Sequence, residues 1–172
     1  MGGSFTFPPA HFQAEGRKLK RVVFVAGGVG INPLMSMLSQ LVIDKDKTED
    51  FEVKFLYSTK DPGASKIQQI LFLDRVKQAI NVLGGRGHLE LFLTSGNDEQ
   101  AGNNDMALSE GLLVRKRRIE GADIIQALGP INERNDTVCY ICGVPGMTDE
   151  FVALAQNAQG MDRRNVLFEK WW

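Results

Sequence analysis

The chain has 172 residues, enough for one domain that buries a sizeable core without a disulfide framework. Hydrophobic residues make up 43% and charged residues 24% of it, and the formal net charge is -1, which excludes a disordered chain and a general nucleic-acid-binding surface. No apolar run approaches the roughly 18 residues of a membrane span, and the N-terminus lacks a signal-peptide or transit-peptide pattern. We therefore expect a soluble protein.

Residues 1–15 begin abruptly with glycines and alternating aromatics, and we interpret them as the tail of a preceding domain. Beyond them, five predicted strands alternate with four helical patterns. The strands are expected at 20–26, 52–58, 88–94, 137–142 and 165–171, and the helices at 32–44, 65–83, 122–128 and 145–159. The alternation predicts an α/β domain over residues 16–172: a Rossmann-like, five-stranded parallel sheet in the order 3-2-1-4-5, with helices on both faces.

The first predicted strand ends in a glycine turn, and Pro33 follows where a helix should begin. Without side chains, Gly27, Gly28 and Gly30 would let backbone N–H groups approach a pyrophosphate, whose charge the helix N-terminus favours. Pro33 suits a first helical turn, where its missing N–H needs no partner, and Asn32 can cap the helix. Taken alone, the glycines fit a tight structural turn about as well as a dinucleotide site.

The later segments carry weaker signals. The second strand ends in "STK" at 58–60, where the usual dinucleotide fingerprint has an acid for the ribose. Residues 95–111 are rich in polar residues and turn formers, and we expect a loop that is disordered rather than functional. The basic run at 114–118 is interpreted as solvated surface rather than a nucleic-acid patch.

Cys139 and Cys142 form a C-x-x-C within the fourth predicted strand. Residues three apart in a strand point to opposite faces, so we expect neither a disulfide nor a shared metal between them. His11 and His88 have no partners at ligand or triad spacing, and no metal site is expected. Two cysteines without a framework indicate a reducing compartment.

Three motifs occur together: G-G-x-G-x-x-P at 27–33, "YICGVPGM" at 140–147 and a terminal "FEKWW" at 168–172. In this order, and at these strand ends, they resemble the NAD(P)-binding domain of the ferredoxin–NADP reductase family, which includes cytochrome b5 reductases and flavohaemoproteins. More narrowly, the chain is similar to oxidoreductase NAD-binding domains. The likeness covers nearly the whole chain from about Gly2.

The resemblance implies a set of binding and catalytic residues. Those expected to bind NAD(P)H are Gly27, Gly28, Val29, Gly30, Ile31, Asn32, Pro33, Ser58, Thr59, Lys60, Cys142, Gly143, Val144, Pro145, Gly146 and Met147. Those expected to act in catalysis are Cys142 beside the nicotinamide, Glu169 near the C-terminus and Trp171 as the aromatic that shields a flavin. From the residues alone, Cys142 and Met147 also fit core positions, and Glu169 fits a solvated strand end.

The chemistry that the resemblance implies is hydride transfer between NAD(P)H and a flavin, FAD or FMN, with an unidentified electron acceptor. The flavin is expected on an N-terminal barrel whose last strand would contain Phe5, so this fragment alone is expected to be inactive. Lys60 could pair with the 2′-phosphate of NADPH, but it also fits a solvated turn, and Asp61 beside it would repel the phosphate, so NADH is only slightly favoured over NADPH. The resemblance also suggests a mitochondrial parent. A non-catalytic Rossmann-like binding or interaction domain is the alternative.

Overall fold

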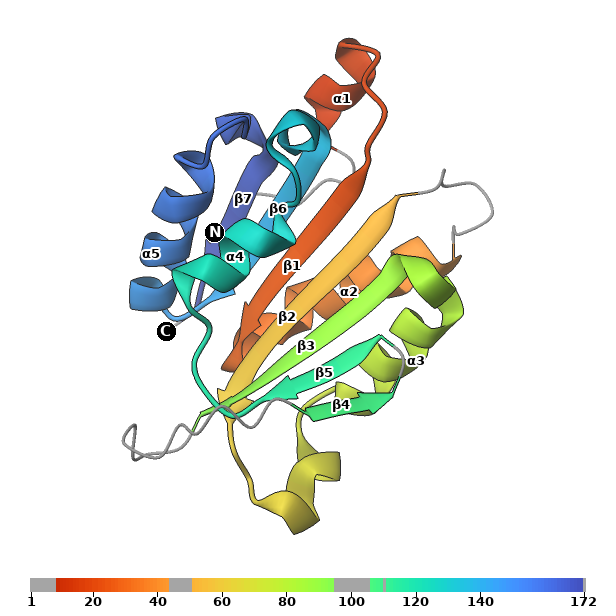
Figure 1. Ribbon diagram of the computed structural model, residues 1–172, viewed down its shortest axis with the longest axis vertical. Helices are drawn as coiled ribbons and strands as arrows, with labels where there is room; N and C mark the ends of the chain where they lie inside the picture. The colour runs from red at the N-terminus through yellow and green to blue at the C-terminus, as the bar shows by residue number, and fades with distance from the viewer. Residues whose placement is uncertain (1–8, 44–50, 95–105, 110, 172) are drawn as a thin grey trace.

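A computed structural model of the chain describes residues 9–43, 51–94, 106–109 and 111–171. Its centre is a sheet that, within these residues, has seven strands in the order β4-β5-β3-β2-β1-β6-β7 (Figure 1). Their bounds are β1 Arg21–Gly27, β2 Glu52–Lys60, β3 Gly87–Thr94, β4 Met106–Ser109, β5 Leu112–Arg115, β6 Thr137–Gly143 and β7 Val166–Lys170. The predicted strands correspond to β1, β2, β3, β6 and β7, which keep their predicted relative order.

The predicted count of five strands was wrong, because β4 and β5 extend the sheet beyond β3. β5 pairs with β3 in parallel, and β4 pairs with β5 antiparallel. Each is only four residues long, too short for alternation to stand out in the sequence. The predicted loop therefore ends in a strand, and the basic run starts in one, with Val114 buried. Residues 95–105 and 110 of the expected loop lie outside the described residues.

β1 lies in the middle of the sheet, paired in parallel with β2 on one side and β6 on the other. Its residues from Val22 to Ala26 are fully buried, as a strand covered on both faces requires. Val22 and Phe24 belong to the core on one face, and Val23 and Val25 to the core on the other. The continuous apolar run of β1 is thus explained by helices on both faces.

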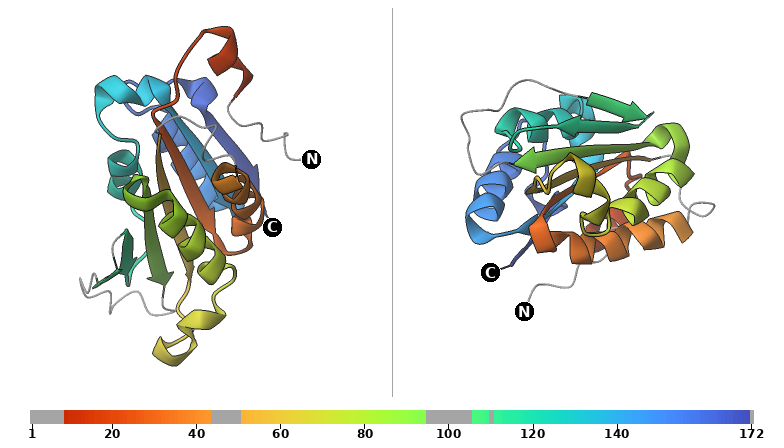
Figure 2. Two further views of the ribbon diagram at one scale, coloured as in Figure 1. Left: turned by 90° about the vertical axis from the view of Figure 1, so that its right-hand side faces the viewer. Right: turned by 90° about the horizontal axis from the view of Figure 1, so that it is seen from below.

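Two helices cover each face of the sheet, as predicted (Figures 1 and 2). α2 (Ile31–Ile43) and α3 (Leu73–Leu83) pack together on one face, and α4 (Gly121–Ala127) and α5 (Pro145–Gln156) on the other. Within the described ranges, no helix is long and apolar enough to cross a membrane.

The helix predicted at 65–83 is broken into two pieces. Residues Ala64–Gln69 form a 3₁₀ turn, η2, and α3 begins only at Leu73. Phe72 precedes α3 with φ of 59°, a left-handed conformation that a continuous helix does not allow.

The N-terminal segment contributes to the core of this domain. Residues Ala10–Ala14 form a short helix, α1, whose Phe12 is buried against the same core as α2 and α3. The predicted domain boundary after residue 15 stays a prediction, and Gly2 and Phe5 lie outside the described residues.

Alternation along β6 separates the two cysteines, as predicted. Cys139 belongs to the core beneath α4 and α5, and Cys142 to the core beneath α2 and α3. Both thiols are fully buried and unbridged. Burial raises the pKa of each to about 12, so both stay neutral at physiological pH.

Candidate functional site

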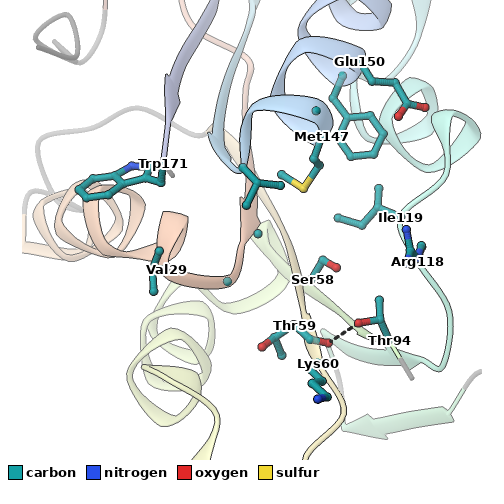
Figure 3. Close-up of a pocket in the computed structure, with 15 residues that line it drawn as sticks. Val29, Ser58, Thr59, Lys60, Thr94, Arg118, Ile119, Met147, Glu150 and Trp171 are labelled. Atoms are coloured by element: carbon teal, nitrogen blue, oxygen red, sulfur yellow. Dashed lines mark hydrogen bonds between the residues drawn. The ribbon is translucent and has the colours of Figure 1, made fainter. Parts of the chain in front are cut away.

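A pocket of about 650 Å³ opens at the carboxyl ends of the parallel strands (Figure 3). Its volume falls within the range of small-molecule and cofactor sites. Val29 and Trp171 lie at one end, Lys60, Thr94 and Arg118 at the other, and Met147 and Ser58 between them (Figure 3). Ligands of open parallel sheets bind at this edge, where the connections from β1 and β6 run to opposite sides.

The three glycines of the first turn differ in what a side chain would meet at each position. Gly28 has φ of +55° and open space where a side chain would begin. A Cβ on Gly27 would lie 2.7 Å from the Met147 sulfur, and one on Gly30 would overlap the Cys142 carbonyl. Gly30 is thus required by packing against backbone, whereas Gly27 is crowded only by the flexible end of the Met147 side chain. Gly28 leaves the backbone open at the pocket, which is the geometry that a pyrophosphate needs.

The turn continues directly into α2, and Asn32 lies inside the helix. The prediction that Asn32 caps it was therefore wrong. Residues Gly28–Gly30 form a 3₁₀ turn, η1, and α2 begins at Ile31. The Asn32 side chain instead donates a hydrogen bond to the Val29 carbonyl, with 3.0 Å between the nitrogen and the oxygen. Pro33 lies in the first turn of α2, as expected.

The second wall of the pocket is the turn from β6 into α5. Pro145 is the first residue of α5, and Val144 before it is 57% exposed, much like Val29 at 55% on the facing turn. Gly146 has open space where a Cβ would be. Both turns therefore present apolar groups and bare backbone to the same opening.

The far end of the pocket has a floor made by the ends of β2 and β3. Lys60 pairs with Thr94 in the ladder, and the Thr94 hydroxyl donates a hydrogen bond to the Thr59 carbonyl at 3.4 Å. The Asp61 amide donates to the Thr94 carbonyl at 2.8 Å. The Asp61 carboxylate accepts a hydrogen bond from the Gly63 amide, also at 2.8 Å, and does not line the pocket.

The three residues expected to act in catalysis lie in different surroundings. Cys142 is fully buried, and burial, aided by the nearby Glu169 charge, raises its pKa to about 12. Glu169 is half-buried and pairs with Cys142 between β7 and β6. Trp171 lines the pocket, while its amide donates to the Gly143 carbonyl at 2.7 Å.

The structure brings ten of the expected site residues together around the pocket, and eight do not line it. Those that line the pocket are Gly27, Gly28, Val29, Ser58, Thr59, Lys60, Val144, Gly146, Met147 and Trp171. Those that do not line it are Gly30, Ile31, Asn32, Pro33, Cys142, Gly143, Pro145 and Glu169.

Sequence reasoning missed five lining residues, Thr94, Arg118, Ile119, Glu150 and Phe151. Thr94 ends β3, so the rule that ligands bind at carboxyl ends of strands could have found it. Arg118 and Ile119 follow β5, a strand that was not predicted. Glu150 and Phe151 lie one helical turn beyond Gly146 and Met147, on the same face of α5.

The sequence matches the family of oxidoreductase NAD-binding domains over residues 24–152. Proteins called oxidoreductase NAD-binding domain-containing protein 1 match over the whole chain, with 30% identity in Bos taurus and 29% in Homo sapiens. The chain spans 51% of each of these relatives, about half their length.

Several solved structures share the fold of this chain. The flavohaem-like FAD/NAD-binding domain of nitric oxide dioxygenase from Vibrio cholerae superposes with a TM-score of 0.61 and 18% identity, over 98% of this chain and 55% of that one. Ferredoxin-NADP+ reductase from Plasmodium falciparum gives a TM-score of 0.57 and 15% identity, over 98% of this chain and 59% of that one. These findings confirm the resemblance seen in the three motifs.

Proposed function

The chain belongs to the oxidoreductase NAD-binding domain family, and on that basis we propose that it positions NAD(P)H for hydride transfer to a flavin held by another domain. The observation that carries the proposal is the shared pocket. Its walls are the glycine turn after β1 and the turn after β6, two segments more than 100 residues apart in sequence, and its floor is the end of β2.

The residues present fit a pyridine nucleotide. Gly28 leaves backbone exposed beside the start of α2, whose positive end stabilises a pyrophosphate. The polar floor at Ser58, Thr59 and Lys60 suits the adenosine ribose, and the apolar end at Val29 and Trp171 suits the nicotinamide. When bound, the nucleotide supplies the hydride, and the protein supplies position and exclusion of water.

Of the three residues expected to act in catalysis, one lines the pocket and two do not. Trp171 presents its indole at the nicotinamide end, where it can stack on a flat ring. The Cys142 thiol is buried and does not line the pocket, whereas the Cys142 backbone carbonyl lies against Gly30 and thereby helps to shape the glycine turn. Glu169 lies behind this wall, next to Cys142, and its catalytic role stays a prediction.

Several finer expectations remain proposals. These are the flavin, the electron acceptor, the inactivity of this segment alone and a mitochondrial location; the relatives named above are about twice as long as this chain. The preference for NADH rested on repulsion by Asp61, whose carboxylate is bound to the Gly63 amide and does not line the pocket. That preference is therefore not carried into the proposal.

Nuclear Overhauser contacts between bound NADH and the isolated chain test the proposed orientation. We expect nicotinamide ring protons to contact the Val29 methyl groups and the Trp171 indole, and adenine protons to contact Thr94 or Ile119. The reverse assignment would contradict the proposed positioning. A folded chain that binds no nucleotide would support the alternative, a non-catalytic interaction domain.

A further inference from the structure

A second groove lies between α2 and α3 and shares no lining residue with the nucleotide pocket. Both helices connect neighbouring parallel strands, so they run side by side in the same direction (Figures 1 and 2). Its volume is about 270 Å³, just below the range of small-molecule sites. One facing residue per helical turn lines each wall: Met35, Ser39 and Val42 on α2, and Arg75, Gln78 and Val82 on α3.

The groove is apolar at the end where both helices finish. Val42 and Ile43 lie in the last turn of α2, and Val82 lies in the last turn of α3. Ile43 is 73% exposed and Val82 is 47% exposed, whereas a surface helix normally presents polar side chains on its outer face. α2 also carries no charged residue along its whole length. This end of the groove therefore presents apolar surface without a covering element among the described residues.

The other end of the groove is cationic. Arg75 lies in the first turn of α3, and its guanidinium stands over the ring of Phe72, 5.3 Å from the centroid. Phe72 is the residue with the left-handed backbone that precedes α3. No carboxylate lines the groove, and Arg75 makes no ion pair within the parts of the chain that the structure describes. The groove thus has one held positive charge and no acid to balance it.

We propose that this groove binds an amphipathic helix of a partner protein, which runs antiparallel to α2 and α3 and carries an acidic residue beside Arg75. Apolar side chains at i, i+3 and i+7 of that helix fill the end between Val42 and Val82, as in other helix-in-groove complexes. The antiparallel direction brings the negative C-terminal end of the bound helix to Arg75 and its positive end to the C-termini of α2 and α3. From Met35 to Ile43 the groove is about 12 Å long, which about three helical turns cover.

Charge and exposure favour a partner helix over two other occupants. A second copy that met the groove across a two-fold axis would bring another guanidinium and no carboxylate. A small amphiphile would lie along the floor and leave the exposed rim at Ile43 and Val82 in water. The bound helix satisfies both the apolar rim and the single charge.

Two stapled helical peptides of about three turns test the proposal. Both carry leucines at i, i+3 and i+7, and they differ only in the last turn, where one has glutamate and the other lysine. In nuclear magnetic resonance titrations of the native chain, we expect the glutamate peptide to shift the methyl signals of Val42 and Val82. It should bind severalfold more tightly than the lysine peptide, because exposed ion pairs contribute modestly.

Val82→Ser should weaken binding of both peptides about tenfold, since a buried valine contributes through its apolar area. Ile131→Ser is the matched control: Ile131 is 49% exposed, does not line the groove, and its replacement should leave both affinities unchanged. An affinity that Val82→Ser leaves intact would overturn the proposal. So would a dimer of the native chain that Val82→Ser dissociates in sedimentation equilibrium, because a second copy would then cover the groove.

Arg75→Gln should remove the preference for the glutamate peptide and leave binding of the lysine peptide the same or tighter. Lys77→Gln, which removes a cation of α3 that does not line the groove, should keep the preference. Equal binding of the two peptides by the native chain would contradict the assigned role of Arg75. The absence of any shift at the groove methyl groups, or shifts there with decanoate but with neither peptide, would overturn the proposal as a whole.

Discussion

At the scale of single residues, the glycines of the site differ in whether packing excludes a side chain or leaves open space at the pocket. A Cβ at Gly30 would overlap the Cys142 backbone carbonyl, whereas one at Gly143 would meet the flexible end of the Met147 side chain, and Gly28 and Gly146 face open space. The amino-acid type alone does not distinguish these cases. Only the surroundings of each Cα show which glycines are available to the nucleotide.

Gly146→Ala gives a prediction that folding alone would not produce. The new methyl meets nothing within 4 Å, and alanine is a better helix former than glycine, so the free energy of unfolding should stay the same or rise by up to about 1 kcal/mol. Because Gly146 lines the pocket, nucleotide affinity should nevertheless fall severalfold in calorimetry. Gly85→Ala, also in open space but at the opposite end of the sheet, is the control and should leave affinity unchanged. Unchanged affinity in both variants would remove Gly146 from the binding surface.

At the scale of elements, the glycine turn is clamped against the end of β6. Gly30→Ala would drive a methyl into the Cys142 carbonyl, and a strand backbone in the middle of the sheet cannot move aside. We expect a loss of at least about 2 kcal/mol in the free energy of unfolding, measured by urea denaturation. A Gly30→Ala protein as stable as the native chain would show that η1 and β6 are not in this contact.

The position of β6 also predicts the chemistry of its cysteines. In the native protein at pH 8, both thiols should resist alkylation, because burial raises their pKa to about 12 and keeps reagent away. After denaturation without reductant, mass spectrometry should find both alkylated. An intramolecular disulfide would contradict their placement on opposite faces of the strand.

At the scale of the whole molecule, a network of charges ties the segment after α1 to the 3₁₀ turn η6 (Arg163–Asn165) before β7. Asp162 accepts hydrogen bonds from Arg164, at 2.8 Å for the closest, and from Arg17, at 3.2 Å. Glu15 pairs with Arg164 at 2.8 Å. The hydrogen bonds from Arg164, with Arg17 contributing, lower the pKa of Asp162 to about 2.

Asp162→Asn should lower the free energy of unfolding at pH 7 by about 1 kcal/mol, since water screens a partly exposed network. The folded-state pKa lies below the ordinary value of about 4, so the stabilisation is fully present above pH 4. The difference between the native chain and the variant should therefore shrink as the pH falls from about 4 to 2. Asp149→Asn, which breaks only the exposed pair with Lys170, is the control and should cost a few tenths of that amount or less. A pH-independent difference at Asp162 would contradict an electrostatic origin.

The sequence was sufficient to predict the sheet order and the pocket walls, because both follow from long apolar runs and from glycines at strand ends. It was insufficient for β4 and β5, whose four residues each are too short to show alternation. Because β5 was not predicted, Arg118 could not be recognised as a residue that follows the end of a strand. The resemblance implied that Cys142 lies beside the nicotinamide, but the side chain is buried in the core beneath α2 and does not line the pocket.

The most direct test of the account is nucleotide binding by a pair of glycine variants, Gly28→Val and Gly16→Val. Both glycines have positive φ, +55° and +65°, with open space around them, so valine should strain the backbone similarly at each position. Only Gly28 lines the pocket. In calorimetric titrations of the folded variants with NADH and NADPH, we expect Gly28→Val to lose binding and Gly16→Val to retain it. If Gly28→Val binds both nucleotides as tightly as Gly16→Val does, the glycine turn is not the nucleotide site.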